Sequence, residues 1–116
     1  MINLPPSVRI FISTAPADMR RSFDGLSAMV KYVIQENPMS GHLFVFTNKR
    51  RDRVKALFWD RTGFVIWYKR LEKGRFKFPT TPEPGQNHVE LEAGQLTLLL
   101  EGIDLSGARR YHKKFF

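Results

Sequence analysis

The 116-residue chain is predicted to fold as one α+β domain. We expect a mostly antiparallel meander sheet of four to five strands, packed on one face by an N-terminal helix and a C-terminal helix. Three observations predict this fold. The length suits a single core. Aromatic and β-branched residues fill several mid-chain runs joined by short turns, which favours antiparallel neighbours. Apolar residues at helical spacing flank those runs on both sides.

The N-terminal part is predicted to hold one strand and one helix. Residues 7–13, SVRIFIS, alternate as a strand that can join the edge of the meander. Asp18 then stands where a helix cap is favoured. A helix is predicted from about 20 to 35, and its apolar face is formed by Phe23, Leu26, Val30, Val33 and Ile34. Pro38 ends it because proline cannot continue a helix.

The middle of the chain predicts the meander. Its four strands are expected at 42–46, 53–60, 64–71 and 75–78. The connections TNKRRD, RTG and EKG are short and turn-like.

The C-terminal part predicts a loop, a short strand and a helix. Residues 79–87 hold three prolines and a glycine and are read as a loop, and 88–92 form a short strand. A helix follows from about 93 to 102, with Leu96, Leu99, Leu100 and Ile103 on one face and Gly102 as its stop. We expect residues 1–105 to form the domain. The basic segment 106–116 has no amphipathic period and is expected to be mobile or ordered only by a partner.

Composition excludes several classes of protein. A hydrophobic content of 42% and an aromatic content of 13% are too high for a disordered chain. The chain has no cysteine, which excludes disulfides and thiolate metal sites and fits the cytoplasm, where we expect the protein. No signal peptide is recognisable at the N-terminus. No apolar run approaches the ~20 residues that a spanning helix needs, so we expect no membrane contact.

The charges are strongly segregated along the chain. The net charge is +8, and residues 47–78 alone carry +8, from eleven Lys or Arg and three Asp or Glu. Residues 79–108 carry −5 and residues 109–116 carry +4. Segregated positive charge produces a local field that attracts polyanions.

Strand alternation is expected to gather these charges on one wet face of the sheet. That face would carry Lys55, Trp59, Trp67, Lys69, Arg75 and Lys77. Cations neutralise phosphates and aromatic rings stack on unpaired bases, so such a face suits nucleic acid. The predicted nucleic-acid contacts are Lys49, Arg50, Arg51, Arg53 and Lys55, extended by Lys69, Arg70, Lys73, Arg75 and Lys77. The alternative is that both tryptophans belong to the core and that the cations are only solvated.

Catalytic patterns are poor in this chain. His42, His88 and His112 lack metal-ligand spacing, and no phosphate-binding glycine loop or nucleophile elbow occurs. Four carboxylates are candidate Mg²⁺ ligands for phosphodiester cleavage, namely Asp18, Asp24, Asp52 and Asp60. Each also has a local explanation as a cap, a turn residue or a counter-charge. We therefore expect no catalytic residue, no metal and no cofactor.

Three stretches together resemble a known family. They are DMRRSFDGL (18–26), GHLFVFTNKRRDRVKALFWDRTGFVIWYKRLEKGRF (41–76) and LLLEGID (98–104). Over about residues 3–105 the chain resembles TnpB, the accessory protein from the second reading frame of insertion sequences of family sixty-six. The family pattern matches Asp18, Arg20, Phe23, Asp24, Gly25, Phe44, Phe46, Asp52, Lys55, Trp59, Gly63, Tyr68, Lys69, Arg70, Leu71, Gly74 and Phe76.

The resemblance implies a non-catalytic accessory protein for bacterial DNA transposition, encoded beside the transposase that cuts and joins DNA. Expected partners are DNA, the element's transposase and a second copy of the chain. Two alternatives stay open. One is a protein-interaction module that binds the transposase or itself without touching DNA, and the other is a small Mg²⁺-dependent nuclease.

Overall fold

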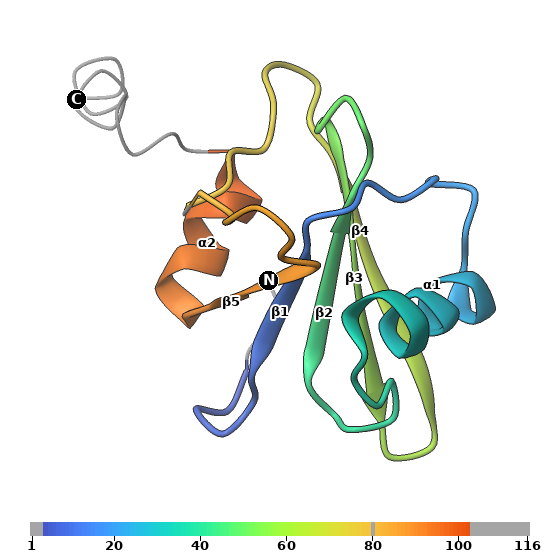
Figure 1. Cartoon of the computed structure of the whole chain (residues 1–116). Helices are drawn as coiled ribbons and strands as arrows, with labels where there is room; N and C mark the ends of the chain where they lie inside the picture. The colour runs from blue at the N-terminus through green and yellow to red at the C-terminus, as the bar shows by residue number, and fades with distance from the viewer. Residues whose placement is uncertain (1–3, 80, 103–116) are drawn as a thin grey trace.

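The computed structural model describes residues 4–79 and 81–102, which form a five-stranded sheet with helices on both sides (Figure 1). The elements follow in the order β1 Ile10–Ser13, α1 Phe23–Met29, η1 Val30–Ile34, β2 Leu43–Thr47, β3 Arg53–Asp60, β4 Gly63–Arg70, β5 His88–Leu91 and α2 Ala93–Glu101. Here η1 is a π-helical extension of α1. The predicted tail 106–116 and Ile103 lie outside the described residues. None of the described helices is long and apolar enough to cross a bilayer.

The sheet is mixed rather than purely antiparallel. Its strand order is β4-β3-β2-β1-β5, and the predicted meander β2-β3-β4 is confirmed. The first strand, however, lies inside the sheet, where it pairs parallel to β2 and antiparallel to β5. The expectation that it joins the edge of the meander is confirmed, and β5 pairs on its other side. A parallel return needs a long crossover, and the α1–η1 segment between β1 and β2 supplies one.

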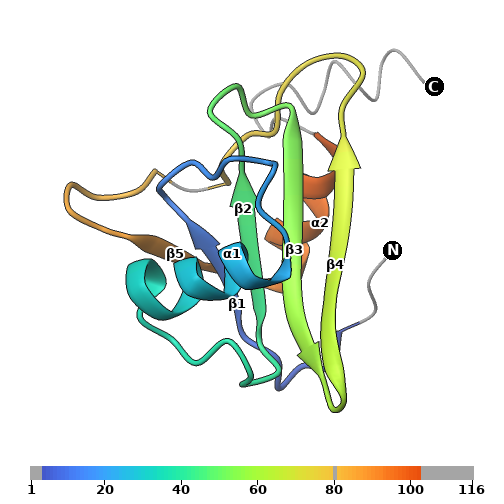
Figure 2. The ribbon, with the colours of Figure 1, turned by 90° about the vertical axis from the view of Figure 1, so that its right-hand side faces the viewer.

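The two helices lie on opposite faces of the sheet, not on one face as predicted (Figures 1 and 2). Side chains of α1 and η1, including Leu26 and Val30, pack with Phe11, Phe44 and other residues of one face. Leu96, Leu99 and Leu100 of α2 pack on the other face. Every residue of β1 and β2 is buried, because each strand is covered on both sides. The continuous apolar run LFVF already indicates such a strand, since one-sided burial would alternate.

The first helix begins later than predicted. Asp18 does not cap it, because its carboxylate accepts hydrogen bonds from Arg20 and the N-cap residue is Ser22. The helical path ends at Ile34, after which Gln35 adopts a left-handed φ of 64°.

The second helix agrees with its prediction. It spans Ala93–Glu101, and Gly102 follows with a left-handed φ of 72°. Glu92 and Gln95 form a reciprocal capping box at its start.

Residues 75–78 do not form the predicted fourth strand of the meander. The chain leaves the sheet after Arg70 and continues as an irregular segment. Phe76, 1% exposed, anchors this segment in the core on the α2 side. Its neighbours Arg75 and Lys77 are exposed. The alternation that suggested a strand therefore reflects one buried anchor between two solvated cations.

Candidate nucleic-acid interface

The turn between β2 and β3 is organised by one asparagine. The Asn48 side-chain oxygen accepts hydrogen bonds from the backbone N–H groups of Asp52 (3.1 Å) and Arg53 (3.0 Å). Its amide nitrogen donates to the Asp52 carboxylate at 2.6 Å. Arg51 completes the turn in a left-handed conformation with φ of 60°. Asparagine is favoured at such turns because its side chain replaces backbone partners, so the sequence contained a signal for this residue that we did not use.

The segment after β4 lies against this turn. The Leu71 N–H donates to the Asp52 carbonyl at 2.8 Å, and the Phe76 N–H donates to the Arg51 carbonyl at 2.6 Å. The Arg51 guanidinium also lies 4.2 Å from the centre of the Phe78 ring. Two stretches that are distant in sequence therefore meet at one end of the sheet, at the top of both ribbon views (Figures 1 and 2).

This junction gathers exposed positive charge. Its cations come from the turn and from the segment after β4, and we call them the turn-end basic surface: Lys49, Arg50, Arg51, Lys73, Arg75 and Lys77. All six are exposed, and no ion pair in the described part of the chain involves any of them. Arg70 is also exposed at this end, but its guanidinium pairs with Glu72 at 3.0 Å. Arg53 is half-buried and donates to the Tyr68 hydroxyl at 3.4 Å.

Two of the predicted contacts do not join this surface. Lys55 is only 8% exposed, and its ammonium donates to the carbonyls of Met19 (2.9 Å) and Arg21 (2.8 Å). Lys69 is half-buried and donates to the Leu100 carbonyl near the end of α2 at 2.8 Å. Both lysines therefore fasten backbone segments to the sheet, and their ammonium groups already donate to backbone carbonyls.

The register of the β3–β4 hairpin explains why the predicted wet face does not exist. Lys55 lies opposite Tyr68, whereas Lys69 lies opposite Val54. The two lysines therefore point to opposite faces of the sheet, as do Trp59 and Trp67. A shift of one residue in register exchanges the two faces of a strand, and the two-residue turn after Asp60 sets the register found here. Trp67 packs against the α2-side core, and Trp59 contacts Phe64 edge-to-face with ring centres 5.0 Å apart.

Replacing Lys55 with methionine is expected to lower the free energy of unfolding by about 2–3 kcal/mol. The change removes two charge-assisted hydrogen bonds and leaves two part-buried carbonyls without their donor. Urea unfolding followed by circular dichroism measures it. The matched control is Lys49→Met, an exposed position where a change within about 0.5 kcal/mol is expected. Equal effects of the two substitutions would contradict a structural role for Lys55.

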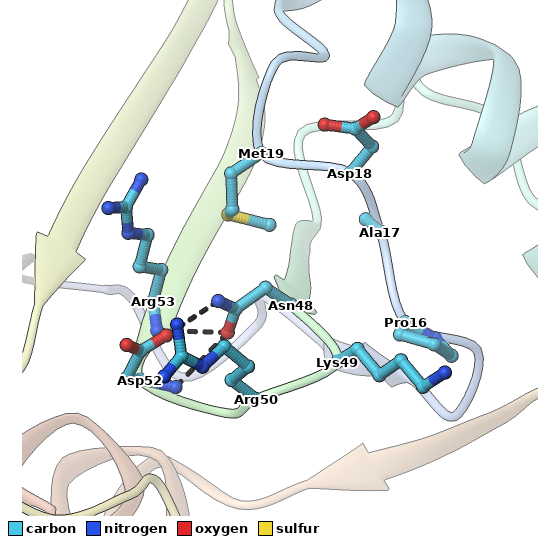
Figure 3. Close-up of a pocket in the computed structure, with 9 residues that line it drawn as sticks. All are labelled: Pro16, Ala17, Asp18, Met19, Asn48, Lys49, Arg50, Asp52 and Arg53. Atoms are coloured by element: carbon cyan, nitrogen blue, oxygen red, sulfur yellow. Dashed lines mark hydrogen bonds between the residues drawn. The ribbon is translucent and has the colours of Figure 1, made fainter.

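A cavity of about 430 Å³ opens beside the turn (Figure 3). The segment before α1 contributes its apolar wall, and the turn contributes polar and cationic groups. Its lining residues are Pro16, Ala17, Asp18, Met19, Asn48, Lys49, Arg50, Asp52 and Arg53. The segment is held in place by the Ala17 N–H, which donates to the Thr47 carbonyl at 2.9 Å. The sequence interpretation missed this apolar wall, because it assigned no site role to Pro16, Ala17 or Met19.

Of the four candidate metal-binding carboxylates, two are hydrogen-bonded to neighbouring side chains and two lie in other parts of the fold. Asp18 and Asp52 both line the cavity, but Figure 3 draws them well separated. Asp18 is held by Arg20 and Asp52 by Asn48. Asp24 lies in the first turn of α1, and Asp60 lies beside Arg61 at the far hairpin. Among the described residues no group of three His, Cys, Asp or Glu side chains is placed to hold a metal ion.

The two described histidines contact other parts of the fold. The His42 ring nitrogen Nδ1 accepts a hydrogen bond from the Arg9 N–H at 3.0 Å. The His88 ring lies edge-on to Phe11, with centres 5.4 Å apart. His112 is outside the described residues.

Acidification is expected to destabilise the fold between about pH 4 and pH 2. Hydrogen bonds from Arg20 lower the pKa of Asp18 from 3.8 to about 2, and the amide of Asn48 lowers the pKa of Asp52. A carboxyl whose folded pKa lies below its unfolded value stabilises the fold above the unfolded value. That stabilisation is lost as the pH falls through the folded value.

Thermal unfolding midpoints at a series of pH values test this expectation. The Asp18→Asn variant is the comparison, because it removes one of the carboxyls whose pKa is lowered in the fold. Its midpoint should fall less steeply with pH than that of the wild type. A midpoint that rises on acidification over this range would contradict the assignment.

Comparison with known proteins identifies the family of this chain. The family described as "IS66 Orf2 like protein" matches residues 8–110. The chain belongs to the IS66 Orf2-like family. The resemblance seen in the sequence is therefore confirmed, and the family associates this chain with the IS66 transposition system.

Two relatives of this IS66 Orf2-like protein come from Sinorhizobium fredii (strain NBRC 101917 / NGR234). "Uncharacterized protein y4jC" is 36% identical over 110 residues, covering 95% of this chain and 92% of the relative. "Uncharacterized protein y4hO" is 38% identical over 98 residues, covering 84% and 83%. No solved structure matches the chain.

Proposed function

We propose that this protein is a non-catalytic accessory protein of IS66 transposition that contacts DNA through the turn-end basic surface. One observation carries the proposal: six exposed cations from two separate segments meet at one end of the sheet, without carboxylate partners in the described part of the chain. Unpaired, solvated cations are free to neutralise phosphates and release counterions.

The geometry supports phosphate contact rather than base reading. The turn is stiffened by the hydrogen bonds of Asn48, so its cations are presented from a defined backbone. No aromatic ring lines the cavity beside the turn, which argues against stacking of an unpaired base there. We therefore propose duplex contact with little direct recognition of sequence.

Binding to duplex DNA across a salt series tests this function. If the six cations each contact a phosphate, the logarithm of the binding constant falls with the logarithm of salt concentration at a slope of about −5. Duplexes carrying the element's ends and unrelated duplexes of equal length should then give similar slopes. A flat salt response, or no binding at low salt, would overturn the proposal.

The cavity beside the turn favours a second candidate function. Its wall of Pro16, Ala17 and Met19 lies next to Lys49 and Arg50, a mixture that suits an acidic protein segment with an apolar residue. In this version the same surface binds the transposase without touching DNA. Co-purification with the transposase after nuclease treatment, together with a flat DNA titration, would favour this candidate over the first.

A DNA cleavage assay on the same protein tests the nuclease alternative. We expect no cleavage of labelled DNA in the presence of Mg²⁺. Any cleavage that is lost in an Asp18→Asn/Asp52→Asn variant would instead support the nuclease alternative, because these two carboxylates share the cavity.

A further inference from the structure

Strand β4 forms one edge of the sheet, and its outer side is not paired with another described strand. It is eight residues long and terminal in the strand order, and no described helix or strand lies beyond it (Figure 2). In an antiparallel pair every second residue directs its backbone N–H and C=O away from its neighbour. Such a row of unpaired groups is a template for another strand.

Six of the eight residues of this edge lack the features that normally prevent pairing. Residues 63–68, GFVIWY, contain no charge and no proline, and the register with β3 runs without a bulge. Val65 is 38% exposed on one face and Tyr68 48% exposed on the other. The opposite edge strand, β5, is only four residues long and carries the exposed Glu90. Short, charged edges of that kind resist association, so the two edges of the sheet differ in this respect.

We propose that β4 pairs antiparallel with β4 of a second copy of this chain. Self-complementarity selects the occupant, and charge selects the direction. The uncharged stretch 63–68 matches a second copy of itself, and Lys69 and Arg70 lie at one end of the strand. Antiparallel pairing places the cationic ends of the two copies at opposite ends of the ladder, whereas parallel pairing would place them side by side. The centre of the ladder is then apolar on both faces and self-complementary, as a two-fold interface requires.

The pairing has a consequence for the turn-end basic surface. That surface lies at the end of the sheet where β4 finishes, so an antiparallel dimer carries one copy of it at each end of a continuous sheet. If the proposed DNA contact holds, one dimer presents two separate duplex-binding surfaces. This consequence alone rests on the proposed function; the pairing does not.

Sedimentation equilibrium without DNA tests the pairing. We expect the wild type to dimerise reversibly and Val65→Lys to dimerise at least about tenfold more weakly, because each interface then gains two cations and loses apolar burial. The matched control Val65→Thr keeps a β-branched side chain without charge and should dimerise nearly as well as the wild type. A monomeric wild type, or an unchanged Val65→Lys dimer, would overturn the proposal. Because DNA is absent, that result leaves the proposed DNA contact untouched.

Cysteine cross-linking gives a second, independent measurement. The chain has no cysteine, so a single introduced thiol can form a disulfide only with a second copy. Val65 and Ile66 lie near the middle of β4, where paired strands bring equivalent residues within disulfide reach. We expect Val65→Cys or Ile66→Cys to cross-link under mild oxidation. Tyr32→Cys, at a position 71% exposed on η1, is the control and should stay monomeric. Equal cross-linking of all three would contradict pairing through β4.

Discussion

Replacing Phe76 with alanine is expected to lower the free energy of unfolding by about 3–5 kcal/mol. The ring is 1% exposed and packs in the same core cluster as Leu96, Leu99 and Leu100 of α2. Its removal leaves a cavity that the irregular backbone around it can close only partly. Urea unfolding of the purified variant measures the change.

Two further variants separate packing from the general cost of losing an aromatic ring. Phe23→Ala removes a ring that is 45% exposed and should cost much less, about 1 kcal/mol or below. Phe76→Leu keeps most of the buried volume and should lie between the wild type and Phe76→Ala. If Phe76→Ala were no more harmful than Phe23→Ala, the anchoring role of Phe76 would be wrong.

Neutralising the turn with Lys49→Gln, Arg50→Gln and Arg51→Gln together is expected to weaken duplex binding by roughly 10²-fold or more at about 0.1 M salt. Three phosphate contacts are lost, so the salt slope should become shallower by about 2.7. Glutamine keeps a long polar side chain, which limits the change to charge. Fluorescence anisotropy across a salt series measures both quantities.

The matched control removes the same net charge elsewhere. Arg21, Lys31 and Arg61 are exposed and do not belong to the turn-end basic surface; they lie on the segment before α1, on η1 and at the β3–β4 hairpin. Their joint replacement by glutamine should leave the slope nearly unchanged. If both triple variants lose affinity equally, binding depends on total charge and the turn-end basic surface is not the site.

Much of the local structure could be predicted from the sequence. The hairpins of the meander follow from aromatic and β-branched runs separated by short polar turns, and these signals act between neighbours in the chain. Helix α2 was predicted from the helical spacing of Leu96, Leu99 and Leu100. Its end was predicted at Gly102, which readily adopts the left-handed φ found there. The cations Lys49, Arg50 and Arg51 were placed correctly at an exposed turn for the same reason, since turn chemistry is local.

Other features depend on contacts between distant segments. Residues 75–78 resemble a strand in isolation, but the burial of Phe76 and its hydrogen bond to Arg51 hold them outside the sheet. The predicted role of Lys55 failed similarly, because the carbonyls it serves belong to residues 19 and 21. The sequence places Lys55 in a strand rather than in the turn, but no neighbouring residue shows which distant carbonyls its ammonium serves.

The amino-acid order was sufficient to specify where chain segments become extended or helical, that the positive charge concentrates between residues 47 and 78, and to which family the chain belongs. The folded molecule alone decided which of those charges reach solvent. A lysine is free or engaged according to the strand register and the helices that cover each face, and both result from packing between residues far apart in the chain.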